Sequence, residues 1–279
     1  MWDEPSLIDH AAGRRSASEV AAAWRDPSAR LLIMNQHGAF EADQGFDTPA
    51  SGQLDDDTVF LGWVAGAPWF ARGGEPAHPV DIRQTHLAPA EHQLATAAMA
   101  VLTWRRHTIR CPLCGGPLQP ADGGYSSLCP ACGHQTFPRQ DPAVICAVLD
   151  GEDRLYLAHN VTWEPGRVSI LAGFVEAGES LEGAVHRELA EEAHLRLSQL
   201  RYYGSQPWPF PRSLMLAFVA RAQSGGQADG VELAWGRWFT PERVRSEMSD
   251  GRLLLPPPAS IAGRLIGEWL DGGLPAPEG

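Results

Sequence analysis

The segment Gly173-Phe-Val-Glu-Ala-Gly-Glu-Ser-Leu-Glu-Gly-Ala-Val-His-Arg-Glu-Leu-Ala-Glu-Glu-Ala-His-Leu195 decides the fold, and it contains six glutamates and one arginine. Apolar residues recur through it at helical spacing, and Ser180 stands where a helix N-cap is expected. The pattern predicts an amphipathic helix from Ser180 to about Leu195. Its core-facing side chains would be Leu181, Val185, Leu189 and Leu195.

Three glutamates of this helix stand at positions i, i+3 and i+4, so Glu188, Glu191 and Glu192 share one face. Like charges at that spacing oppose helix formation by about 0.2 to 0.5 kcal/mol per pair, and a cation should therefore compensate them. Hard carboxylate oxygens suit Mg²⁺ or Mn²⁺. The alternative, a solvated acidic face, is the usual explanation of a charge run. The fixed spacing favours a metal site here.

Two Cys-x-x-Cys pairs, separated by fourteen residues, predict a second metal site of a different kind. Two such turns can close a tetrahedron around Zn²⁺, and four protein ligands leave no position for an activated water, so this zinc would be structural. Two disulfides or free thiols are the alternative. The expected ligands are Cys111, Cys114, Cys129 and Cys132. The fifth cysteine, Cys146, lies in an apolar run and is expected in the core.

The composition excludes several classes of function. Of 279 residues, 22 are basic and 34 are acidic, and all the basic residues are arginine, so lysine Schiff-base chemistry is ruled out. A net charge of −12 disfavours non-specific binding to nucleic acid or anionic membranes. No signal peptide and no apolar run of about 18 residues is present, so we expect a cytoplasmic protein without a membrane span.

Outside these motifs, the pattern predicts two regions of secondary structure. Residues 29–40 and 58–72 read as a small sheet with a turn at 66–68, and a helix follows from Pro89 to about His107. Downstream, the expected elements are a Gly-rich loop near Ala172, a terminal helix at 260–270, and strands at 143–149, 154–158, 199–203, 214–221 and 235–239. This alternation indicates α/β layering.

The acidic segment resembles the Nudix box, whose pattern is Gly, five residues, Glu, seven residues, then Arg-Glu-apolar-x-Glu-Glu-x-Gly-apolar. Every specified position matches except the final Gly, which is His194. That glycine usually leaves the helix in the left-handed region, which His can adopt at a cost of about 1 kcal/mol. The catalytic carboxylates are unaffected by this departure.

The resemblance implies a metal-dependent hydrolase of nucleoside diphosphate derivatives. Glu188, Glu191 and Glu192 would bind the catalytic cations, with the Ala172 carbonyl and Glu232 completing the ligand set. Arg187 would orient the carboxylates and Glu179 would anchor the preceding loop. The bound cations would bridge the diphosphate and activate a water, whose proton passes to Glu191 or Glu192. These two bases are not distinguished by the sequence.

A second motif, Ser205-Gln-Pro-Trp-Pro-Phe-Pro-Arg-Ser213, has three alternating prolines that stiffen the backbone and present two aromatic rings. Alone, it could be a rigid loop with core aromatics. It is similar to the Ser-Gln-Pro-Trp-Pro-Phe-Pro-Gln-Ser array of the NADH pyrophosphatase branch of Nudix enzymes, from which Arg212 differs. The same branch carries a four-cysteine ribbon and a Leu-Pro-Pro-Pro segment, as at Leu255–Pro258.

This closer resemblance implies a Nudix α/β/α sandwich with a mixed sheet (139–279), a zinc ribbon (108–138) and a small N-terminal α+β domain (1–107). It implies a homodimer that cleaves NADH to NMNH and AMP, acts on NAD⁺ and removes NAD caps from RNA. The implied substrate-binding residues are Phe137, Phe174, Gln206, Pro207, Trp208, Pro209, Phe210, Pro211, Arg212, Ser213, Ala262 and Arg83.

Two other functions remain open at this point. One is a Nudix hydrolase for another dinucleotide or a nucleotide sugar, because Arg212 and His194 depart from the family pattern. The other is a zinc-ribbon regulator that binds nucleotides without cleaving them. The complete set of Arg187 and three glutamates argues against a regulator, since a sensor does not need hydrolytic carboxylates.

Overall fold

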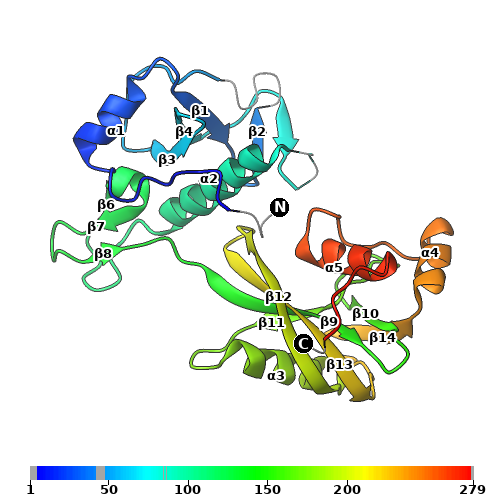
Figure 1. Ribbon diagram of the computed structural model, residues 1–279. Coiled ribbons are helices and arrows are strands. Elements are labelled where there is room, and N and C mark those ends of the chain that lie inside the picture. Colours follow the sequence, from blue (N-terminus) through cyan, green and yellow to red (C-terminus); the bar gives the residue numbers. More distant parts are fainter. Residues whose placement is uncertain (1–4, 42–47, 84, 86, 278–279) are drawn as a thin grey trace. The chain divides into compact units, whose positions relative to one another are not determined.

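The computed structural model describes residues 5–41, 48–83, 85 and 87–277, which fold as two compact units (Figure 1). The first unit contains residues 5–140 together with Trp208–Arg212, and the second contains 141–207 and 213–277. No helix among these residues combines the length and apolar character that crossing a bilayer requires. The zinc ribbon falls within the first unit, and the division into three domains stays a prediction.

The first unit is built on a sheet with the order β3-β4-β1-β2-β5 among its described residues. Its strands are β1 (Arg30–Met34), β2 (Ala39–Glu41), β3 (Val59–Val64), β4 (Ala67–Gly73) and β5 (Pro79–Asp81). β1 and β4 run parallel, and the other pairs are antiparallel. The turn between β3 and β4 is Ala65-Gly66, both with positive φ, so the predicted turn at 66–68 overlaps it only at Gly66, and Ala67 and Pro68 already belong to β4.

Two helices cover opposite faces of this sheet. α2 (Pro89–His107) packs on the side of Leu32 and Met34, whereas α1 (Ala17–Trp24) packs on the side of Leu31. The alternation follows from the two-residue period of a strand. The predicted helix α2 is confirmed, and it begins at the expected proline. The sequence reading missed α1, although Ser16 and Glu19 form a capping box at its start.

The cysteine region follows α2 as a small antiparallel sheet. It contains β6 (Gln119–Ala121), β7 (Ser126–Leu128) and β8 (Gln135–Thr136) in that order, with a short 3₁₀ turn, η2 (Asp122–Gly124), between β6 and β7. These strands are too short to bury an apolar core of their own. Their geometry must therefore be held by the cysteine ligands and by packing on the rest of the unit.

The second unit contains a mixed sheet with the order β12-β13-β9-β10-β14, and β11 pairs with β9. Its strands are β9 (Asp141–Leu149), β10 (Leu155–Asn160), β11 (Leu171–Phe174), β12 (Arg196–Trp208), β13 (Ser213–Ser224) and β14 (Leu233–Phe239). β9 is central and runs parallel to β13 but antiparallel to β10 and β11. The expected mixed sheet is confirmed.

Helices lie on both faces of this sheet, as the ribbon shows (Figure 1). α3 (Leu181–Ala193) covers the face of Val144 and Cys146, while α4 (Pro241–Ser249) and α5 (Ile261–Leu270) cover the face of Ile145. The unit is therefore an α/β/α sandwich, as expected. Cys146 is a core residue, also as expected, and burial raises the pKa of its thiol.

Two expectations in this unit need correction. Ala172 does not lie in a Gly-rich loop but inside β11, where it pairs with Ile145 of β9. Glycine at 173 suggested a loop, yet here it serves close packing within a strand. The strands predicted at 199–203 and 214–221 extend to 196–208 and 213–224. Helix α4 was missed, although Thr240 caps it and Pro241 begins it.

One buried side chain ties β12 to the start of α5. Gln206 is 2% exposed, and its amide nitrogen donates to the Ala259 carbonyl at 2.9 Å while its amide oxygen accepts from the Ile261 N–H at 2.7 Å. Both polar ends of Gln206 are thus used inside the unit. Ala262, also buried, follows directly in α5. Gln206, at the start of the proline array, therefore has a structural function, because it joins β12 to the start of α5.

Replacing Gln206 with Ala should lower the free energy of unfolding by about 1 to 3 kcal/mol, because a buried N–H and a carbonyl lose their partner. Urea unfolding followed by circular dichroism measures the change. The matched control is Gln223→Ala on β13, an exposed position where a change within about 0.5 kcal/mol is expected. Equal effects of the two substitutions would contradict the structural function of Gln206.

Candidate functional site

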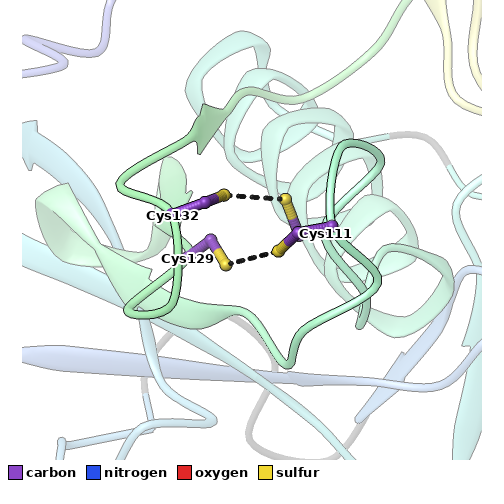
Figure 2. A group of neighbouring side chains, drawn as sticks. Cys111, Cys129 and Cys132 are labelled. Atoms are coloured by element: carbon purple, nitrogen blue, oxygen red, sulfur yellow. Dashed lines mark hydrogen bonds between the residues drawn. The ribbon is translucent and has the colours of Figure 1, made fainter.

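The four cysteines of the ribbon converge on one point. Their ligand atoms all lie within 4.8 Å of one another, and the side chains of Cys111, Cys129 and Cys132 point toward each other in Figure 2. The sulfurs of Cys111 and Cys132 are 3.6 Å apart, and those of Cys114 and Cys129 are 3.5 Å apart. A disulfide needs about 2.05 Å, so this spacing fits shared metal ligation rather than two disulfides. None of the five cysteines is in a disulfide.

The backbone explains why the sulfurs meet. After each pair comes a glycine in the left-handed region, Gly115 at φ 74° and Gly133 at φ 75°. The Gly115 N–H donates to the Cys111 carbonyl at 2.9 Å, and the Gly133 N–H donates to the Cys129 carbonyl at 2.8 Å. The two turns thus have the same geometry. Four thiolates in this arrangement can fill the tetrahedral shell of a zinc ion, which makes it structural.

The acidic helix α3 is fixed at both ends. The Ser180 hydroxyl accepts the Gly183 N–H at 3.0 Å, and the helix ends at His194, whose φ of 53° and ψ of 26° are left-handed. The expectation that His194 adopts the conformation usually reserved for glycine is confirmed. Leu189 and Val185 are buried against the sheet, and Glu192, which is only 8% exposed, lies beside them at the edge of this buried face.

Arg187 connects this helix to the strand and loop before it. Its guanidinium binds Glu179 in a bidentate pair at 3.0 and 2.9 Å, and it reaches Glu188 at 2.8 Å and Glu191 at 3.2 Å. The same group donates to the Phe174 carbonyl at 2.9 Å. These bonds, first to Glu179 and then to Glu188, raise the pKa of Arg187 and keep it charged.

The carboxylate of Glu188 lies against β11. A Cβ built on Gly173 would stand 2.0 Å from its carboxyl carbon, so a larger residue here would displace the Glu188 carboxylate. Ala172 is the adjacent residue of the strand, and its backbone therefore runs beside the Glu188 side chain. The strand therefore passes beside the Glu188 carboxylate, and metal binding by the Ala172 carbonyl stays a prediction.

Glu192 is the most unusual carboxylate of the site. It is only 8% exposed, and within the described part of the chain no hydrogen bond reaches its carboxylate. Burial, and then the charges of Glu188, Glu232, Asp229 and Glu191, raise the pKa of Glu192 to about 8. Arg187 compensates other carboxylates but not this one. An uncompensated buried acid of this kind is typical of a functional site.

The donor set fits divalent cations. Several carboxylates lie close enough to Glu192 for their charges to act on it, and carboxylate oxygens are the ligands that Mg²⁺ and Mn²⁺ prefer. Among the described residues, only the four cysteines have three or more ligand atoms within 4.8 Å of one another. The carboxylate oxygens are therefore spread more widely, as mutual repulsion dictates. Mg²⁺ retains several waters, which can bridge such spacings.

The sequence reading missed Asp229, which places Glu232. The Asp229 carboxylate accepts the backbone N–H groups of Val231 at 3.1 Å and Leu233 at 2.9 Å, and that of Glu232 at 3.1 Å. These bonds, first that from Leu233, lower the pKa of Asp229. The Asp229 N–H donates to the Glu192 carbonyl at 2.9 Å. An Asp-Gly pair before a strand was the available signal.

The other expected binding residues divide between the two units. Phe137 and Phe174 are 61% and 59% exposed, which suits rings that stack on a ligand. In the first unit, the Arg83 guanidinium lies 4.9 Å from the Phe210 ring, and Trp208 meets Phe210 edge-on at 5.2 Å. In the array, Pro209 is buried, Ser213 is half-buried, and Pro207, Pro211 and Arg212 are exposed. Substrate contacts of these residues stay predictions.

The pKa of Glu192 predicts a pH dependence of stability in the metal-free protein. Because its folded value of about 8 lies above the ordinary 4.5, the folded state keeps the proton that the unfolded state loses. The stability that the folded state gains from keeping Glu192 protonated is fully present below pH 4.5 and is lost as the pH rises to about 8. With EDTA present, the melting temperature should therefore fall between pH 5 and pH 8 more steeply than in Glu192→Gln. Identical slopes would contradict the raised pKa.

Comparison with known proteins adds two family matches to this geometry. Residues 139–255 match the NUDIX domain, and residues 106–137 match the NADH pyrophosphatase zinc ribbon domain. A crystal structure of a NUDIX hydrolase from Nitrosomonas europaea is similar with a TM-score of 0.46 and 24% identity, covering 60% of this chain and 94% of that chain.

Curated relatives extend the similarity over nearly the whole chain. The NAD-capped RNA hydrolase NudC of Mycobacterium bovis is 39% identical over 288 residues, which cover 94% of this chain and 92% of that protein. The NAD-capped RNA hydrolase NUDT12 of Homo sapiens is 35% identical over 231 residues, covering 72% of this chain and 50% of that protein. This chain therefore belongs to the Nudix hydrolase family, in its NADH pyrophosphatase (NAD-capped RNA hydrolase) branch.

Proposed function

We propose that this protein hydrolyses the pyrophosphate bond of NADH and NAD⁺, giving NMNH or NMN together with AMP, and that it removes NAD caps from RNA. The observation that carries the proposal is the buried, uncompensated carboxylate of Glu192 at the centre of an acidic cluster. Such a group is costly unless it binds cations. The relatives named as NAD-capped RNA hydrolases support the choice of substrate.

The proposed catalytic cations are Mg²⁺ or Mn²⁺, held by Glu188, Glu191, Glu192, Glu232 and the carbonyl of Ala172. When bound, such cations neutralise the diphosphate and lower the pKa of an attacking water. Glu191 or Glu192 accepts the proton of that water. Arg187 holds Glu188 and Glu191 in place through its bonds at 2.8 and 3.2 Å.

The aromatic residues supply the contacts that select a dinucleotide. Phe174 is exposed, and Arg187 holds its backbone carbonyl at 2.9 Å, so its ring is available to stack on a nicotinamide. Phe137, Trp208 and Arg212 are proposed as further substrate contacts. The homodimer and the cytoplasmic location expected from the sequence are also kept as proposals. The proposed role of zinc is purely structural.

The proposal is tested by following AMP release from NADH, NAD⁺, ADP-ribose and diadenosine compounds in the presence of Mg²⁺ or Mn²⁺. We expect NADH to be cleaved fastest, and Glu192→Gln to reduce kcat by about 10² to 10³, equivalent to losing a few kcal/mol of cation-dependent stabilisation. NMNH as the second product would locate cleavage at the pyrophosphate.

The matched control is Glu182→Gln, which removes an exposed carboxylate from the first turn of the same helix α3. Its activity should stay within about twofold of the parent, since it lies outside the cluster. A folded Glu192→Gln protein as active as the parent would disprove the metal site. Preference for ADP-ribose or a diadenosine compound over NADH would instead support the alternative of another dinucleotide or nucleotide sugar.

A further inference from the structure

His194 makes a contact that glycine at this position cannot make. Its ring Nδ1 lies 3.0 Å from the Gln227 carbonyl oxygen. Because a carbonyl oxygen only accepts, Nδ1 carries the hydrogen and donates it. The Nudix pattern has glycine here, which has no side chain. The left-handed backbone of His194 directs its ring to the segment that precedes Glu232.

This bond belongs to a group of three that close the end of α3 onto the same segment. The Gln227 N–H donates to the Ala193 carbonyl at 3.0 Å, and the Asp229 N–H donates to the Glu192 carbonyl at 2.9 Å. The His194 ring adds the third bond, and it comes from a side chain. Asp229 in turn fixes the backbone of Glu232, whose charge acts on Glu192.

The segment needs such a restraint because it begins with two glycines. Gly225 and Gly226 have φ values of 101° and 102°, which is a region where the backbone has few steric limits. Gly225 also passes close to His194, since a Cβ built on it would lie 3.1 Å from the His194 carbonyl oxygen. Without the ring, the segment would keep its two backbone bonds to α3 and the bond from the Trp238 indole N–H to the Gly225 carbonyl at 3.0 Å, but the Gln227 carbonyl would lose the bond from His194.

We propose that His194 is a positioning residue that holds residues 225–232 against the end of α3 and so keeps Glu232 beside Glu192. It thereby strengthens the binding of divalent cations at the carboxylates. This inference rests on the proposed function for its biological meaning, but the restraint itself exists in the metal-free chain. One hydrogen bond of this kind corresponds to about a two- to tenfold change in an equilibrium constant.

Two variants distinguish the effect of losing the imidazole ring from the effect of a more flexible backbone at position 194. His194→Gly removes the ring and adds backbone freedom, whereas His194→Ala removes the ring without adding that freedom. The control is Ala65→Gly, which relieves a left-handed residue at φ 49° in the turn between β3 and β4 and removes no hydrogen bond. Hydrogen exchange measured by mass spectrometry on metal-free protein reports on peptides that cover 225–233. Titration with Mn²⁺, followed by electron paramagnetic resonance, gives the cation affinity.

We expect both His194 variants to exchange these amides about two- to tenfold faster than the parent and to bind Mn²⁺ more weakly by a similar factor. The Mn²⁺ concentration for half-maximal activity should rise more than kcat falls. Ala65→Gly should match the parent in all three measurements. Unchanged exchange in either variant, or faster exchange in His194→Gly alone, would refute the restraint by the ring.

Faster exchange with unchanged Mn²⁺ affinity would refute the link from His194 to the metal ligands. These outcomes are independent of the substrate. If the parent bound Mn²⁺ and responded to the His194 substitutions but cleaved no dinucleotide, the proposed function would fail while the positioning of Glu232 by His194 would stand.

Discussion

The catalytic half of the site depends on one guanidinium, that of Arg187, and on how its donors are shared. Its planar fork binds Glu179 at two points and still reaches Glu188, Glu191 and a backbone carbonyl. A lysine ammonium could not span these positions in one plane. Because these bonds go to Glu179, Glu188, Glu191 and the Phe174 carbonyl, none of them reaches Glu192. The carboxylates of the cluster therefore differ, since Glu188 and Glu191 are paired with Arg187 and Glu192 is not.

The sequence predicted what depends on local spacing. Carboxylates at i, i+3 and i+4 share a helix face wherever the helix lies. Each Cys-x-x-Cys pair fixes the geometry of its own turn, and a shared metal ion would bring two such turns together. The helix α3, the four-cysteine cluster and the left-handed His194 were all found in this way. Asp229 was missed because its importance comes from pairing with the distant carbonyl of Glu192. Ala172 was misplaced because glycine at 173 is compatible with a loop and with a crowded strand alike.

The proline array shows a different limit of sequence reasoning. A stiff aromatic segment could pack in the core or contact a ligand. In this array, some residues pack or form hydrogen bonds inside the protein. Gln206 has both polar ends bound inside the second unit, and Phe210 packs partly against the core of the first. Phe174, in contrast, exposes most of its ring beside the fixed arginine. Exposure of a large ring next to a rigid polar network has no packing benefit, and this makes Phe174 the stronger candidate for stacking on a base.

The two metal sites differ in what the free protein already provides. At the ribbon, left-handed glycines aim the thiols at one point, so the ligands are preorganised, and a zinc ion held by all four would have no open position. At α3, repulsion keeps the carboxylates apart, and burial holds Glu192 in its protonated form up to about pH 8. Binding there must release a proton and draw the acids together. Cations bound there would offset the burial of Glu192 and the repulsion from its acidic neighbours, whereas zinc at the ribbon would hold short strands that have no core of their own.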